Sequence, residues 1–299
     1  MEYVLPAVLH VSCLLGLTAN LIIVAANIMK WKRLKSLPIC DKILNSLAIS
    51  RGLYFFSNII WTSIFQIFPW LVQNNVVSST VNILNMFMLN SSNWIATILC
   101  VFYCVKIITY NNKFFIFLKT RISTMLPWLF QASLLISLIS SLPFNLHGFG
   151  LSGRVEFNGS IDNMTDYRVV TSQILLSRFL LYAVTYYPPF IIFCVANFLL
   201  IHFLLMHTRR MRYNGSHIQS PNLESHFSAL KTMTLFLLLQ IMILICMCIS
   251  ISGKFLFSDL QILVPIVECC PPLFHSLYMV ASSSELRKML TCLGLLRCS

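Results

Sequence analysis

The sequence predicts an all-α membrane protein whose seven helices cross the bilayer as a single bundle. The first observation behind this prediction is composition: of the 299 residues, 58% are hydrophobic and only 10% are charged, with a mean hydropathy of +0.80. A soluble domain carries about 25% charged residues, so the composition excludes that class. The second observation is the spacing of the polar segments, which divide the chain into seven apolar stretches. Each stretch is close to or above the roughly 20 residues that a helix needs to cross a bilayer.

These stretches become helices because lipid offers no hydrogen-bond partner to an unpaired backbone amide. The third is the least apolar, since several Asn side chains interrupt it, and the fifth is long enough to extend beyond the membrane. In the fifth, Pro188 and Pro189 lack amide hydrogens and are expected to interrupt the helical hydrogen bonds. In chain order the stretches are residues 5–29, 43–65, 77–101, 123–142, 171–206, 232–251 and 260–281.

The orientation follows from the Lys and Arg residues. Most of the 21 lie in the connections after the first, third and fifth stretches and in the C-terminal tail, whereas only Arg154, Arg168 and Lys254 lie in the opposite connections. Cytoplasmic loops carry this excess, so the N-terminus is expected outside the cell. We expect one domain, 1–299, ending in a short cytoplasmic tail, 282–299. The first stretch has no basic leader and is expected to be a helix rather than a cleaved signal peptide.

Two basic residues, Arg51 and Arg178, fall inside the predicted spans. Arg51 lies ten residues beyond Asp41 along the second stretch, which is about 15 Å at the helical rise and therefore near the midplane. An ionised side chain there costs about 2.5–3.5 kcal/mol on insertion scales, so its donors need polar neighbours. Asn20 and Ser276 are the candidates. The group is either a packing clamp or a switch whose hydrogen bonds differ between two states of the protein.

Glu268 is the only acid well inside a span. It is either protonated and hydrogen-bonded, or paired with Arg178, or exposed to a water-filled cavity where it attracts cationic ligands. Asn85 and Asn90 supply hydrogen bonds either to the same cavity or between helices.

Several function classes find no support in the sequence. No nucleophile elbow, phosphate-binding loop or metal-ligand spacing accompanies the seven His residues, so we expect no enzyme, no cofactor and no metal site. The net charge of +12 is mostly a matter of topology, so no nucleic acid partner is expected. A secondary transporter, the main alternative, predicts internal repeats and several intramembrane acids. Asn158 and Asn163 form glycosylation sequons in a loop that the charge rule places outside.

Short motifs along the whole chain resemble those of the bitter taste receptors, the type 2 taste receptor family of G-protein-coupled receptors. Residues 47–51 read LAISR, residues 102–107 read FYCVKI, residues 226–231 read HFSALK, and the last helix closes with His275 and Ser276. Type 1 vomeronasal receptors are the closest alternative among receptors, but the first two motifs favour the bitter taste receptors.

The resemblance implies a multi-pass plasma-membrane receptor that binds small bitter compounds between the outer halves of its helices and activates a gustducin-type heterotrimeric G protein. Asn85, Leu89 and Ile243 depart from the letters that the family often carries, so the resemblance does not transfer a ligand range. The expected ligand-binding residues are Trp61, Asn85, Leu89, Asn90, Arg178, Tyr182, Ile243, Pro265 and Glu268. The residues expected in activation and G-protein engagement are Arg51, Tyr103, Lys106, His226, Leu230, His275 and Ser276.

Overall fold

The computed structural model describes residues 4–72, 74–108, 113–145, 164–213, 221–251 and 257–283. Its helices correspond one to one with the predicted stretches, apart from the four-residue helix α3 (Pro69–Val72) and the 3-10 turn η1 (Leu142–Asn145). The seven long helices are α1 (Val4–Leu34), α2 (Ile39–Ile67), α4 (Asn75–Ile107), α5 (Lys113–Ser141), α6 (Met164–Tyr213), α7 (Pro221–Ile251) and α8 (Phe257–Ser282).

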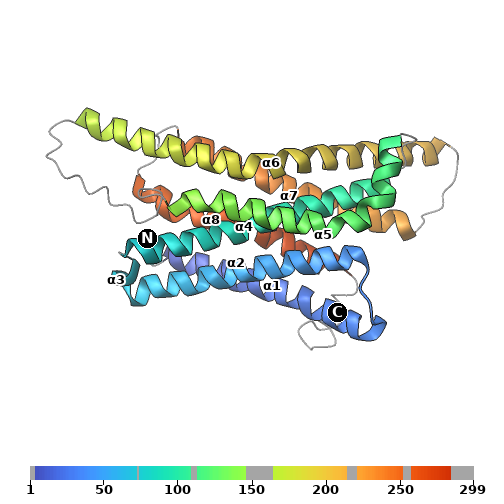
Figure 1. The fold of residues 1–299 in the computed structure, drawn as a ribbon, viewed down its shortest axis with the longest axis horizontal. Helices are drawn as coiled ribbons and strands as arrows, with labels where there is room; N and C mark the ends of the chain where they lie inside the picture. Colours follow the sequence, from blue (N-terminus) through green and yellow to red (C-terminus); the bar gives the residue numbers. More distant parts are fainter. Residues whose placement is uncertain are drawn as a thin grey trace.

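The long helices lie side by side as one bundle, all running along the long axis of the molecule (Figure 1). On length and composition alone, four described stretches are able to cross a membrane: Pro6–Leu34, Asn75–Ile107, Phe115–Ser141 and Ala183–Met206. The predicted seven-helix membrane bundle is confirmed.

The helices continue past the apolar stretches that predicted them. α5 begins at Lys113 rather than 123, and α7 begins at Pro221 rather than 232. The hydropathy of the sequence falls where a helix leaves the hydrocarbon core and reaches the lipid headgroups. The backbone hydrogen bonds of the helix do not depend on hydropathy, so the helix continues beyond the apolar stretch. Pro188 and Pro189 lie inside α6 and do not end it, because the helix continues over 50 residues. Neither proline has an amide hydrogen, so the helical hydrogen bonds that these two residues would donate are absent, as expected.

Helix α4 occupies the centre and packs against α2, α5 and α6. In its most apolar window 78% of residues are buried, against 22% for α5 at the periphery. The Asn residues that weaken the hydropathy signal therefore point at other helices. Asn93, for example, accepts a hydrogen bond from Gln240 of α7 at 3.1 Å.

The two larger of the three hydrophobic clusters among the described residues lie at different depths in the bundle. The inner cluster joins α2, α4, α5, α6 and α7 in the cytoplasmic half, with Leu47, Leu99 and Phe236 among its members. The outer cluster joins α1, α2, α4, α6 and α8, with Phe55 and Leu273 among its members. Between these two apolar regions lies a layer of buried polar side chains.

Candidate functional site

The buried polar layer is centred on Arg51, which is only 1% exposed. The Nε of Arg51 donates to Ser92 Oγ of α4 at 3.1 Å, and its Nη1 donates to both His275 Nδ1 and Ser276 Oγ of α8. Ser276 in turn donates to Asn20 Oδ1 of α1 at 3.1 Å. We call these five residues the Arg51 cluster.

The Arg51 cluster connects distant parts of the chain. It joins α1, α2, α4 and α8 by hydrogen bonds, and the Arg51 guanidinium also lies 5.3 Å from the centre of the Phe236 ring of α7. The predicted contact between Arg51 and Ser276 is confirmed, whereas Asn20 joins through Ser276 rather than directly. Because Arg51 donates to Nδ1 of His275, that imidazole is assigned as neutral, with its proton on Nε2.

Position along α2 explains why Arg51 lies in this layer. Leu47, one turn toward the cytoplasm, belongs to the inner hydrophobic cluster, while Tyr54 and Phe55, one turn outward, belong to the outer one. The spacing of three to four residues puts all of them on the same face of the helix. No described acidic residue forms a salt bridge with Arg51, so its charge is stabilised by neutral acceptors and an aromatic face.

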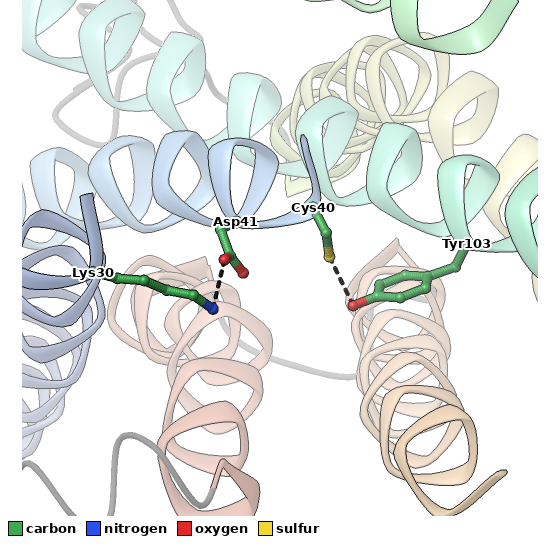
Figure 2. Close-up of polar contacts among 4 residues, drawn as sticks. All are labelled: Lys30, Cys40, Asp41 and Tyr103. Atoms are coloured by element: carbon green, nitrogen blue, oxygen red, sulfur yellow. Dashed lines mark hydrogen bonds and ion pairs between the residues drawn. The ribbon is translucent and has the colours of Figure 1, made fainter. Parts of the chain in front are cut away.

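At the cytoplasmic end, two polar contacts join α2 to its neighbours (Figure 2). Lys30 of α1 and Asp41 form a salt bridge of 2.8 Å, and Cys40 lies 2.9 Å from the Tyr103 hydroxyl of α4. Cys40 precedes the predicted span 43–65, and burial raises the pKa of its thiol above the ordinary value. The thiol therefore stays protonated at physiological pH and shares a neutral hydrogen bond with Tyr103.

The other residues expected to engage a G protein lie near this end. Lys106 is exposed and its Nζ lies 5.8 Å from the centre of the Phe102 ring. Leu230 is half-buried on α7. His226 is on the same helix, but its side chain lies outside the described residues.

The expected ligand-binding residues fall on several helices in the outer half. Asn85 accepts a hydrogen bond from Ser57 of α2 at 2.7 Å, and Leu89, one turn along the same face of α4, packs in the outer hydrophobic cluster. Trp61 is half-buried on α2, and Ile243 is buried on α7.

Asn90 and Glu268 have different surroundings. Asn90 donates to Ser140 of α5 at 3.4 Å, so it faces away from the neighbours of Asn85. Both Asn residues thus make the interhelical bonds that the sequence left open as an alternative. Glu268 is 6% exposed on α8, next in the chain to Cys269 of the outer hydrophobic cluster.

Part of the expected site is not described. The side chains of Arg178, Tyr182 and Pro265 lie outside the described residues, as do the sequons at Asn158 and Asn163. The proposed pairing of Arg178 with Glu268 therefore stays a prediction. Among the described side chains, no group of three or more His, Cys, Asp or Glu residues is arranged to hold a metal ion.

Comparison with known proteins agrees with this geometry. The sequence profile of the family described as Taste receptor protein (TAS2R) matches residues 1–297. Over 282 residues the chain is 29% identical to taste receptor type 2 member 39 of Mus musculus, covering 92% of this chain and 86% of the relative. It is 30% identical over 280 residues to taste receptor type 2 member 9 of Homo sapiens, covering 92% and 88%. The chain belongs to this receptor family.

Membership establishes a multi-pass bitter taste receptor of the plasma membrane and selects this family over the vomeronasal alternative. The similarity is spread across nearly the whole chain, as in taste receptor type 2 member 40 of Gallus gallus, which is 30% identical over 279 residues with 92% and 89% coverage.

Sequence reasoning missed several residues of the receptor's polar layer and inner end. Ser92 and Phe236, which hold two sides of the Arg51 guanidinium, resemble the many other Ser and Phe residues of the spans. Cys40 was missed because its partner, Tyr103, is 63 residues away. The opposite charges of Lys30 and Asp41, on either side of the first short connection, were the one signal available for their salt bridge.

Proposed function

We propose that this receptor binds small bitter compounds among the outer halves of α2, α4, α6, α7 and α8 and activates a gustducin-type heterotrimeric G protein. The observation that carries the proposal is the Arg51 cluster. It lies between the outer half, where Trp61, Asn85 and Glu268 are found, and the inner half, where Tyr103 and Lys106 are found.

The mechanism is a shift in population between two arrangements of the helices. A ligand stabilises the active arrangement only by binding it more tightly than the inactive one. The Arg51 cluster is joined by hydrogen bonds to α1, α2, α4 and α8 and by the Phe236 ring to α7, so a movement of any of these helices changes one of its contacts. Those hydrogen bonds are buried in a packed core, where a donor that loses its partner must find another one. The helices therefore change between two discrete arrangements and do not shift continuously.

On the outer side, we assign ligand contact to residues from all five helices. Trp61 and Leu89 offer apolar surface, Asn85 offers an amide, and Ile243 lines the α7 side. Asn90 faces α5 and is left out of the proposed contact. Glu268 supplies the one intramembrane carboxylate and would attract a cationic ligand. Arg178, Tyr182 and Pro265 complete the proposed set.

On the inner side, opening between the connections that follow α4 and α6 would admit a helix of the G protein. Tyr103, Lys106, His226 and Leu230 are assigned to that contact, with the 282–299 tail as a cytoplasmic segment. The proposed glycans on Asn158 and Asn163 would lie on the opposite side of the membrane.

The decisive experiment is a calcium-response screen of bitter compounds in cells that express the receptor with a gustducin-containing chimeric G protein. We expect concentration-dependent responses to some compounds and none in cells lacking the receptor. A receptor that reaches the surface but responds to none of a broad set of bitter compounds would contradict the proposal.

The role of Glu268 is tested with agonists from that screen. Glu268→Gln should weaken responses to cationic agonists more than to neutral ones, because only the cations lose a charge partner. Asp41→Asn is the matched control, since it removes the same charge at the inner end and should affect both agonist classes equally. Equal losses for both classes in Glu268→Gln, at matched surface expression, would exclude the charge-partner role.

A further inference from the structure

The outward face of α5 carries a stripe of exposed side chains that starts at the cytoplasmic end of the helix. Residues three or four apart lie on the same side of a helix, and the members of this stripe follow that spacing. All of them are exposed, in contrast to Ile122 and Leu126 on the side that packs in the inner hydrophobic cluster. We call the set the α5 stripe: Lys113, Phe117, Arg121, Met125 and Trp128.

The stripe is basic at its cytoplasmic end and apolar beyond it. Arg121 lies 20 residues before Ser141, where α5 ends, a distance of about 30 Å at the helical rise and the thickness of the hydrocarbon core. Arg121 therefore lies at the inner boundary of that core, and Lys113, two turns further, lies among the cytoplasmic headgroups. Met125 and Trp128 face the acyl chains of the inner leaflet.

The Arg121 guanidinium is held toward the headgroup layer. Its Cζ lies 5.2 Å from the centre of the Phe117 ring, one turn closer to the cytoplasm. A helical side chain leans toward the N-terminus of its helix, which is the cytoplasmic end of α5. No described residue accepts a hydrogen bond from the five N–H donors of this guanidinium, so they are available to a ligand.

The positive charge at this end of α5 is not neutralised within the described part of the chain. Neither Lys113 nor Arg121 forms a salt bridge with a described acidic residue, and the first turn of α5 contains no acid. α2 also begins at the cytoplasmic side, but there Asp41 occupies the first turn and pairs with Lys30 (Figure 2). The N-terminus of a helix adds partial positive charge, so an anion is favoured beside the start of α5.

We propose that the α5 stripe binds one anionic phospholipid of the cytoplasmic leaflet. Arg121 and Lys113 bind the negative groups of its head, and its acyl chains lie against Met125 and Trp128. The cytoplasmic leaflet is the one that carries anionic lipids such as phosphatidylserine. Cations at headgroup depth next to an exposed apolar surface at acyl depth match the two ends of such a lipid.

The test is lipid binding by the purified full-length receptor, which needs no agonist and so does not depend on the proposed ligands. Native mass spectrometry counts the phospholipids on the intact receptor as phosphatidylserine or phosphatidylcholine is added to the detergent solution. A basic side chain near an anionic surface strengthens binding about five-fold. Arg121→Gln and Lys113→Gln should each weaken binding of phosphatidylserine by that factor and leave binding of phosphatidylcholine nearly unchanged.

Lys119→Gln is the matched control. Lys119 is a basic, exposed residue at the same end of α5, but two residues from Arg121 it is turned by about 200° around the helix, away from the stripe. This variant should bind phosphatidylserine as the wild type does. Arg121→Lys retains the charge and should also retain most of the binding.

Two outcomes on the lipids would overturn the proposal. One is equal weakening in Lys119→Gln and Arg121→Gln, which would show a general attraction to the basic end without a site. The other is equal affinity of the wild type for phosphatidylserine and phosphatidylcholine. The alternative occupant of the stripe is a second copy of the receptor. A mass of two copies that falls to one in Trp128→Ala, with or without added lipid, would overturn the proposal as well.

Discussion

The middle of the bundle and its cytoplasmic end both contain polar contacts between helices, but in different surroundings. Arg51 is 1% exposed, and its hydrogen-bonded partners on α4 and α8 are equally hidden. The side chains of Lys30 and Asp41 are 23% and 18% exposed at the cytoplasmic end (Figure 2). Both regions join α2 to its neighbours through contacts that include a charged side chain. They differ in burial and in the partner, which is neutral for Arg51 and oppositely charged for Lys30.

Burial decides how much a broken contact costs. In the Arg51 cluster, water cannot replace a lost partner, so the remaining donor or acceptor keeps its full desolvation penalty. Around Lys30 and Asp41, water and salt are able to take the place of either partner. Mutations that remove one partner should therefore have large effects in the middle and small effects at the end.

The largest effect is expected from breaking the Arg51 cluster on one side. His275→Ala removes the closer of the two acceptors of Arg51 Nη1, leaving Ser276 Oγ at 3.3 Å, and removes a ring that packs 5.0 Å from Phe236. The free energy of unfolding should therefore fall by about 3 kcal/mol. Thermal unfolding of the purified receptor measures this loss. His202→Ala, at an exposed position of α6, is the control and should change little.

Replacing Arg51 and His275 together distinguishes between the two roles considered for the Arg51 cluster, a packing clamp and a switch between states. Arg51→Met with His275→Leu removes the charge as well as its partner, and such apolar replacements restore much of the stability lost by a single substitution. We expect a stable receptor at the cell surface that no longer responds to agonists. A normal response from this double variant would show that the cluster is a packing clamp only.

An intermediate effect is expected where α1 and α2 approach most closely. A Cβ at Gly16 would lie 2.5 Å from ring atoms of Phe55, which is fully buried and has no room to move. Gly16→Ala should cost about 1–3 kcal/mol of stability through overpacking. Gly52→Ala is the matched control, because its nearest atoms lie 3.9 Å away. Equal melting midpoints for the two variants would show that the helices adjust freely.

The smallest effect is expected from the salt bridge at the cytoplasmic end. Lys30→Met or Asp41→Asn should each lower stability by less than about 1 kcal/mol, since the pair is partly exposed. A double-mutant cycle measured by thermal unfolding gives the coupling, which should shrink at high salt. A coupling as large as the His275→Ala effect would contradict the role given to burial.

The sequence predicted those contacts of the Arg51 cluster that follow from the free energy needed to place a charged side chain in lipid. Arg51 needed polar partners, few polar residues lie at its depth, and Ser276 was therefore among the candidates. Ser92 was not predicted, because a serine in a helix commonly bonds its own helix, as Ser91 does with Phe87. Hydropathy also marked the third stretch as the weakest, although it forms the most buried of the four described spans.

The number of helices, their orientation and the position of a buried charge were determined by the sequence, because each depends on the transfer of residues between water and lipid. Only the tertiary structure decided which faces of the helices meet. Lipid and the protein interior are both apolar, so hydropathy does not show which helix is buried: it is higher for α5, which faces mostly outward, than for α4, which is buried at the centre. Close packing and paired polar groups make that distinction, and they depend on side chains far apart in the chain, such as Arg51 and His275.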